Sequence, residues 1–145
     1  MGIGNNEKAK EIEALEAKLD LKIPVFYREI LANFPKEIRE RAPLELDDDE
    51  QEVGGCLMIL ESLAMLEDLN LEFRDLLTNE AELSEWFATG SDGCGNYYLI
   101  STKGDGDKIF FFDHEEGEIS PRFSSAKAYI AECCDALDSE SDPEY

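Results

Sequence analysis

The sequence predicts an α+β fold, a single domain with a twisted antiparallel sheet of about four to six strands and helices packed on it. Three observations lead to this prediction. Two β-prone runs, 86–88 and 97–100, flank a turn with three glycines, which is the pattern of an antiparallel hairpin. Runs with apolar residues three and four positions apart, typical of helices, lie on both sides of this hairpin. The hairpin is too aromatic for a ribbon in solvent, so we expect a layer that covers it.

The elements can be assigned in order along the chain. We expect helices at residues 7–19, 24–34, 62–77 and 124–136. We expect strands at residues 57–61, 85–89, 96–101 and 109–113, paired in one antiparallel sheet. The first helix follows from Ile12, Leu15 and Leu19, which form one apolar stripe. Pro24 suits the first turn of the second helix, and Pro35 ends it.

Serines and acids mark the remaining boundaries. Ser62 is expected to cap the third helix, and either Ser124 or Ser125 the last one. The segment 44–55 is predicted to be a loop, because its consecutive acids repel one another and do not pack on one face. Residues 1–137 are therefore predicted to form one globular domain, and residues 138–145 an acidic C-terminal tail that frays.

The expected core combines the hairpin with the first two helices. Trp86, Tyr98 and Phe111 should be substantially buried. The residues expected to pack against them are Ile12, Leu15, Tyr27 and Leu31. A chain of 145 residues with 43% hydrophobic residues is long enough and apolar enough to close a core of this kind.

The cysteines and the apolar runs indicate a cytoplasmic protein. Cys56, Cys94, Cys133 and Cys134 form no C-x-x-C pair, and two of them are adjacent, which suits reduced thiols better than a disulfide framework. No apolar run approaches the length of a membrane span, and the N-terminus lacks the basic-then-apolar pattern of a signal peptide.

The net charge narrows the classes of partner. Thirteen lysines and arginines face thirty-five aspartates and glutamates, which gives a formal net charge of −22. Such a surface repels nucleic acid and anionic lipid, and it attracts basic proteins over long distances. The alternative is that the charge serves solubility alone.

The motifs give no support for a catalytic or metal site. The calcium-loop template D-x-[DN]-x-[DN]-G fails at Asp105, at Asp92 and at the acidic run that begins at Asp47. His114 is the single histidine, which excludes a multi-histidine metal site, and no motif places a nucleophile near it for base catalysis. We therefore expect no enzyme activity, no metal and no cofactor.

The acids that lie in predicted loops and turns are the candidate partner-binding residues. Loops held by a rigid sheet are where binding residues concentrate, and within each cluster of the sequence these acids have no lysine or arginine between them. They are Asp47, Asp48, Asp49, Glu50 and Glu52 in the acidic loop, Asp92 in the hairpin turn, and Asp113, His114, Glu115 and Glu116 at the end of the last predicted strand.

Three segments carry the pattern of a known family. The first joins IEALE (12–16) to IPVFYREIL (23–31), the second is the hairpin with its leading tryptophan (86–100), and the third is IFFFDHE (109–115). Between the first two, ILESL (59–63) lies where the family places a strand that enters a helix. In this order and spacing the segments resemble the SUKH superfamily, which includes fungal Knr-type cell-wall regulators and many bacterial immunity proteins.

The resemblance implies a function as well as a fold. It implies an α+β domain without catalytic activity, and for bacterial members it implies binding and neutralising a cognate toxin, often a nuclease, in the cytoplasm. Nucleases are commonly basic around the cleft that holds phosphates, so a domain with a charge of −22 suits that task. The alternative is a regulatory scaffold that binds cellular proteins through the same domain.

Overall fold

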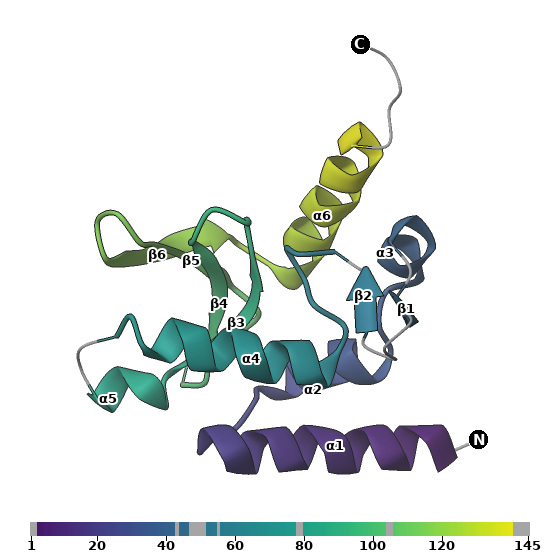
Figure 1. The fold of residues 1–145 in the computed structure, drawn as a ribbon, viewed down its shortest axis with the longest axis horizontal. Helices are drawn as coiled ribbons and strands as arrows, with labels where there is room; N and C mark the ends of the chain where they lie inside the picture. Colours follow the sequence, from purple (N-terminus) through teal and green to yellow (C-terminus); the bar gives the residue numbers. More distant parts are fainter. Residues whose placement is uncertain are drawn as a thin grey trace.

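The computed structural model of the protein describes residues 3–42, 44–46, 52–54, 56–77, 80–103 and 106–140. Its centre is a four-stranded antiparallel sheet in the order β3-β4-β5-β6, and a separate two-stranded ribbon joins β1 and β2. Helices pack against the sheet, so the chain forms the predicted α+β fold (Figure 1). Within the described ranges, no helix combines the length and the apolar character that a membrane crossing requires.

Three helices open the chain, and prolines precede the second and the third. These helices are α1 (Ile3–Leu19), α2 (Val25–Ala32) and α3 (Lys36–Arg41). The carbonyl of Pro24 accepts hydrogen bonds from the N–H groups of Tyr27 and Arg28, which starts α2. Pro35 separates α2 from α3, where the sequence predicts the end of the second helix. The first helix begins at Ile3 and is therefore longer than predicted.

The four strands of the central sheet follow one another as a meander. They are β3 (Trp86–Ser91), β4 (Tyr97–Ser101), β5 (Ile109–Asp113) and β6 (Glu118–Phe123). The first three correspond to predicted strands, whereas β6 was missed. β6 pairs antiparallel with β5, with Ser120 opposite Phe111. Pro121 argues against a strand in the sequence, because proline is tolerated in a sheet mainly on an edge strand. β6 is such an edge strand.

The segment 57–61, predicted as the first strand of the sheet, does not form a strand. Cys56 and Ile59 form an isolated antiparallel bridge across a turn, so the chain folds back within this apolar run. The prediction was wrong in conformation because a short apolar run has no period that separates a strand from a buried turn. Both Ile59 and Leu60 are nevertheless buried in the core.

The acid-rich segment predicted as a loop contains two short strands. β1 (Leu44–Leu46) pairs antiparallel with β2 (Glu52–Gly54), so the loop prediction over 44–55 was wrong at these positions. Each strand spans only three residues, which is too short for an alternating pattern to stand out in the sequence. The acidic residues 47–50 lie outside the described residues.

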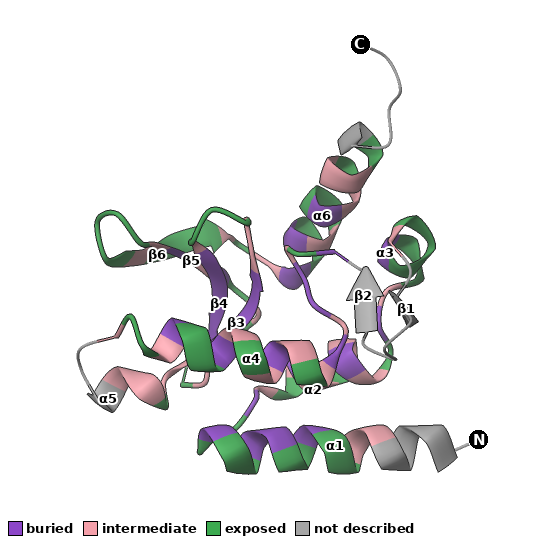
Figure 2. Ribbon diagram, viewed as in Figure 1, coloured by how far each residue is buried: buried purple, intermediate pink, exposed green. Residues whose placement is uncertain are grey.

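Helices cover both faces of the central sheet, which explains why β4 and β5 are apolar at consecutive positions. The residues on one face are Phe87, Tyr98, Ile100 and Ile109, which pack with α1, α2 and α6 (Ala126–Glu140). The residues on the other face are Ala88, Tyr97, Leu99 and Phe112, which pack with Phe73 of α4 (Leu63–Arg74). Figure 2 shows that β3 and β4 are buried along most of their length.

The predicted core is confirmed in most of its members and corrected in two. Tyr98 is buried, and so are the four residues predicted to pack against it from α1 and α2. Trp86 and Phe111 are only half-buried. Trp86 lies at the start of edge strand β3 with its ring 5.0 Å from that of Phe110. The Arg122 guanidinium covers Phe111 at 5.6 Å from the ring centroid, so a cation rather than a helix shields that ring.

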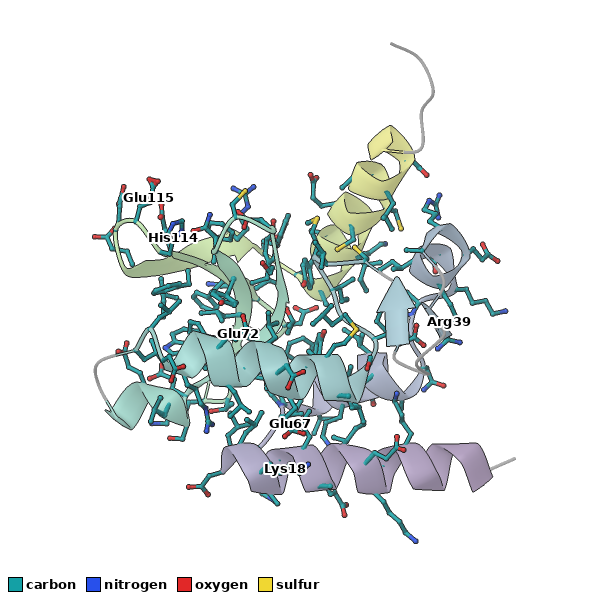
Figure 3. The ribbon with its side chains drawn as sticks, in the orientation of Figure 1. Lys18, Arg39, Glu67, Glu72, His114 and Glu115 are labelled. Atoms are coloured by element: carbon teal, nitrogen blue, oxygen red, sulfur yellow. The ribbon has the colours of Figure 1, made fainter. Side chains whose placement is uncertain are left out.

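Side-chain contacts fix the helices to one another. Ser62 caps α4 as predicted, accepting a hydrogen bond from Met65 N at 3.3 Å. Lys18 of α1 and Glu67 of α4 form an ion pair at 3.1 Å, and both are labelled in Figure 3. A short helix, α5 (Glu80–Leu83), occupies part of the link that leads into β3.

The last helix extends beyond the predicted boundary of the domain at residue 137. Ser125 caps α6 by accepting a hydrogen bond from Ala128 N at 3.1 Å, and the helix continues to Glu140. Arg41 of α3 donates from Nε to Asp138 Oδ1 at 2.7 Å, which holds this end of α6 against α3. Residues 141–145 lie outside the described residues.

Two cysteines meet in the core. Cys133 of α6 and Cys56 are both buried, and a hydrogen bond between the two thiols, together with burial, raises the pKa of Cys133. Cys94 is a free thiol exposed in the β3–β4 turn, away from this pair. Burial and a raised pKa both keep the Cys133 thiol protonated and unreactive at neutral pH.

Candidate functional site

The predicted partner-binding residues for which side chains are described gather at one end of the central sheet. Since successive strands of the meander are antiparallel, the β3–β4 turn and the β5–β6 turn project from the same end (Figure 1). We call this region the acidic sheet end, and its residues are Asp92, Asp113, His114, Glu115 and Glu116. Figure 3 shows His114 and Glu115 together there, on the opposite side of the molecule from α1.

Asp92 organises the β3–β4 turn. Its Oδ1 accepts hydrogen bonds from the backbone N–H groups of Cys94 at 2.8 Å and Asn96 at 3.3 Å, and its Oδ2 accepts one from Asn96 Nδ2 at 2.8 Å. Burial alone would raise the pKa of Asp92, but these hydrogen bonds to the charged form outweigh it and lower the pKa. Gly93 and Gly95 take positive φ angles of 82° and 94°, which only glycine adopts without strain.

Asn96 joins this turn to the β5–β6 turn. Its Oδ1 accepts a hydrogen bond from His114 N at 2.9 Å and lies 2.7 Å from His114 Nδ1. Because Asn96 Nδ2 donates to Asp92, its Oδ1 is left as an acceptor, so His114 carries its proton on Nδ1. The imidazole lies against Gly95, where a Cβ would be 3.3 Å from Nδ1. Asp92, Asn96 and His114 therefore form one connected chain across the two turns.

Asp113 holds the second turn in the same way. Its Oδ1 accepts a hydrogen bond from Glu115 N at 2.9 Å, and its carbonyl accepts one from Gly117 N at 2.7 Å. The side chains of Glu115 and Glu116 are exposed, and no lysine or arginine of the described residues forms an ion pair with either. The turn thus presents unneutralised carboxylates on a backbone fixed by hydrogen bonds.

Of the remaining predicted site residues, only Glu52 is described, and it does not lie at the acidic sheet end. Asp47, Asp48, Asp49 and Glu50 lie outside the described residues, and Glu52 lies in β2. Figure 1 shows the β1–β2 ribbon beside α3, on the other side of the molecule from the β5–β6 turn. The acids predicted to bind the partner therefore belong to at least two separate regions of the protein.

Asn96 belongs to the candidate site but was not predicted as a site residue from the sequence. It was treated only as the start of a strand, whereas its amide connects the two acidic turns. The spacing Asp92-x-x-x-Asn96 across a glycine-rich turn could have indicated it, because aspartate and asparagine side chains bond to nearby backbone groups in turns. Its contact with His114 depends on strand register and could not be found from spacing.

The chemistry available at this end is electrostatic recognition. The connected groups are carboxylates, one amide and one imidazole, and the hydrogen bonds among them hold positions rather than activate a nucleophile. Among the described residues, no group of three or more histidine, cysteine, aspartate and glutamate side chains has the geometry to hold a metal ion. The arrangement suits a basic protein surface placed against it.

Fold and site together define the class: an α+β domain with helices on both faces of a four-stranded antiparallel sheet and carboxylates fixed at one sheet end. The model of the SMI1/KNR4 family (SUKH-1) matches residues 7–132. The chain therefore belongs to this family, and the resemblance to the SUKH superfamily is confirmed. Comparisons with curated proteins and with solved structures gave no match.

Proposed function

We propose that this protein is a non-enzymatic cytoplasmic immunity protein that binds and neutralises a basic toxin domain of the nuclease class. Membership of the SMI1/KNR4 family (SUKH-1) is consistent with an immunity protein or a cell-wall regulator. The charge of the chain favours the first of these roles. Thirteen cations cannot neutralise thirty-five carboxylates one to one, so a large negative field remains however the side chains pair.

The observation that supports this proposal most directly is that Glu115 and Glu116 form no ion pair with any lysine or arginine in the described part of the chain. Glu115 and Glu116 are exposed beside a turn that Asp113 and Asn96 hold in place. A nuclease cleft that binds phosphates is itself basic, so a fixed acidic surface can occupy its field and exclude the nucleic acid. Such complementarity speeds association more than it strengthens the final complex.

A regulatory scaffold is the second candidate, since family membership supports it equally. The two candidates differ in their partners. An immunity protein forms a stoichiometric, salt-sensitive complex with one toxin domain and abolishes its activity, whereas a scaffold binds several unrelated cellular proteins. A gene for a large secreted toxin with a basic C-terminal domain beside the gene for this protein would favour the immunity role.

The test is association with the basic toxin domain encoded beside the gene, measured by stopped flow at several salt concentrations. The Glu115→Gln/Glu116→Gln variant should lower the association rate and its salt dependence, because it removes two steering charges. The matched control is Glu11→Gln/Asp68→Asn, which removes two exposed charges from α1 and α4. Nuclease activity titrated with the protein should fall to zero at one equivalent.

The same measurement tests the acidic run. Changing Asp47, Asp48 and Asp49 to asparagine should also slow association if this run lies at the rim of the complex. Unchanged association in that variant would restrict the interface to the acidic sheet end. Equal effects of the sheet-end variant and of its control would show that total charge alone matters, and the absence of any stoichiometric inhibition would refute the immunity function.

A further inference from the structure

An open apolar groove lies between helices on the side of the sheet that α6 covers. It encloses about 540 Å³, and the side chains that line it come from α2, α3, α6, the α2–α3 junction and the β4–β5 loop. A volume of this size falls within the range of about 300–1,000 Å³ that is usual for binding pockets. The groove does not include any residue of the acidic sheet end.

The apolar walls of the groove follow from helical spacing. Phe26 and Ile30 lie one turn apart on α2, and Ile130 and Cys134 lie one turn apart on α6. All four side chains are only half-buried and pack against the main core, and Ala131 between the α6 pair is exposed. Apolar side chains therefore reach the surface here on helices whose positions the core fixes.

The core residues beside the groove make it a preformed site. Tyr27 and Leu31 of α2 are buried next to the groove-lining pair of that helix, and Tyr129 and Cys133 are buried next to the pair of α6. Since each helix buries the positions adjacent to those it exposes, neither can rotate to hide the groove without losing core contacts. The walls are rigid, so a bound side chain would not have to order them.

Carboxylates predominate at the rim. Glu37 and Asp107 both line the groove, and Asp107 is held there by a hydrogen bond from Ala126 N at 3.0 Å. Burial raises the pKa of the Cys134 thiol, Arg41 opposes this, and the carboxylates of Glu37, Asp138 and Asp135 raise it further. These acids therefore lie close enough to the groove to act on it electrostatically, and they outnumber Arg41 and the lining cation Lys127.

We propose that this groove binds the apolar face of an amphipathic, lysine- or arginine-rich helix of a protein partner. A groove between two helices accepts the i, i+3 and i+4 ridge of a third, and the acidic rim complements basic residues beside that ridge. The proposal rests on the proposed function in that the partner is basic. It adds that the apolar groove retains the partner, whereas the acidic sheet end speeds its arrival.

The test uses a synthetic helical peptide of leucine and lysine with one apolar face, and its binding is measured by fluorescence anisotropy. Ala131→Arg places a long charged side chain in the groove and should weaken binding by about tenfold or more. The matched control is Ala128→Arg, at an exposed alanine of α6 that does not line the groove. It adds the same charge and should leave affinity within about twofold. Thermal melts of both variants should match that of the unmodified protein, since both alanines are exposed.

A second pair of measurements separates shape from charge. A peptide of the same composition with its leucines distributed around the helix should bind at least about tenfold more weakly. Glu37→Gln should weaken the amphipathic peptide by up to about fivefold and reduce the salt dependence of its binding. Equal affinity for both peptides, or equal effects of Ala131→Arg and Ala128→Arg, would overturn the proposal. If the unmodified protein is a dimer and Ala131→Arg is a monomer, the groove binds a second copy of the chain, and the proposal is also overturned.

The groove and the proposed function can fail separately. If Ala131→Arg does not affect toxin binding, the proposal that the groove binds the partner is overturned, but the immunity function is not. Selective binding of the amphipathic peptide by a protein that inhibits no toxin would support the groove and refute the immunity function. In a toxin complex, Ala131→Arg should speed dissociation, whereas the Glu115→Gln/Glu116→Gln variant should slow association.

Discussion

The side chain of Asn70 takes the place of a neighbouring strand for Ala88. Asn70 Oδ1 accepts a hydrogen bond from Ala88 N at 2.7 Å, and Asn70 Nδ2 donates to Ala88 O at 3.0 Å and to Leu66 O at 2.8 Å. Asn70 is fully buried, as is Ala88. One amide of α4 thus satisfies both backbone groups of an edge-strand residue in a place that water does not reach.

Asn70→Ala should therefore be strongly destabilising. It leaves the N–H and the carbonyl of Ala88 buried without a partner, and each orphaned group costs about 1–3 kcal/mol, so we expect a loss of roughly 2–4 kcal/mol. Urea unfolding followed by Trp86 fluorescence measures this loss. Asn33→Ala, at an exposed asparagine that ends α2, is the control and should change stability by less than about 0.5 kcal/mol. Similar losses in both variants would show that the Asn70 bonds contribute nothing specific.

Gly90 marks the place where residues 57–60 pass along the outer edge of β3. Ser91 N donates to Leu57 O at 2.7 Å, and Leu60 N donates to Thr89 O at 2.9 Å. A Cβ on Gly90 would lie 1.9 Å from the carbonyl oxygen of Met58, which is backbone and cannot rotate away. Glycine at this position is what allows the segment to cover the edge.

Gly90→Ala should displace that segment. We expect a loss of about 1–3 kcal/mol or more from the forced backbone shift, with faster hydrogen exchange at the amides of Leu60 and Ser91. Gly106→Ala is the comparison, since Gly106 has a positive φ of 82° but open space around its Cβ position. It should lose stability through local strain while exchange at Leu60 and Ser91 stays slow. Unchanged exchange in Gly90→Ala would show that the close approach has no structural role.

The segment 57–61 also shows which features of the fold could not be predicted from the sequence. Within residues 57–61, Ile59 and Leu60 are buried whereas Leu57 is exposed, and the turn at Leu57 and Met58 lies against Gly90, more than thirty positions away. β6 was not predicted for a related reason. Its residues are largely exposed, and it is a strand because it pairs with β5 rather than because of its own sequence pattern. Periodicity predicts elements that bury one of their own faces, as in α1 and α4, and it says little about elements defined by a neighbour.

The candidate site could likewise be predicted only in part from the sequence. That Asp92 and Asp113 lie in turns follows from the glycines around them, and the meander then brings the two turns to one end of the sheet. The bond from Asn96 to His114 requires the register of β4 on β5, which the sequence does not state. The groove between α2 and α6 was not foreseen, because half-buried apolar residues look the same in sequence as buried ones.

Substitutions of Leu31 and Val25 compare how much a buried and an exposed side chain of α2 contribute to stability. Leu31 is 1% exposed within the core, whereas Val25 on the same helix is 69% exposed. Leu31→Ala should cost roughly 2–5 kcal/mol through the cavity it leaves. Val25→Ala should change stability by less than about 0.5 kcal/mol, because its side chain is already in water. Denaturant unfolding of the two variants measures both values, and a loss below about 0.5 kcal/mol for Leu31→Ala would place that residue outside the core.

The β3–β4 turn should depend on pH through Asp92. Hydrogen bonds from Asn96 and Cys94 to the charged carboxylate lower its pKa in the folded protein below the value of about 3.9 that it has when unfolded. The stabilisation from Asp92 is therefore fully present above that unfolded value and is lost as the pH falls through the folded pKa. At neutral pH, Asp92→Asn should be less stable than the unmodified protein, and the difference should shrink in acid.

Two measurements check this dependence. The ¹³C shift of the Asp92 carboxyl should titrate below about 3.9, and the amide shifts of Cys94, Asn96 and His114 should follow the same curve because the two turns are linked. Asp68→Asn on α4 is the control and should show no such convergence in acid, since Asp68 is exposed and accepts no such set of hydrogen bonds among the described residues. A carboxyl of Asp92 that titrates at its ordinary pKa, with His114 unmoved, would show that the turns are not coupled and that the acidic sheet end is not held rigid for a partner.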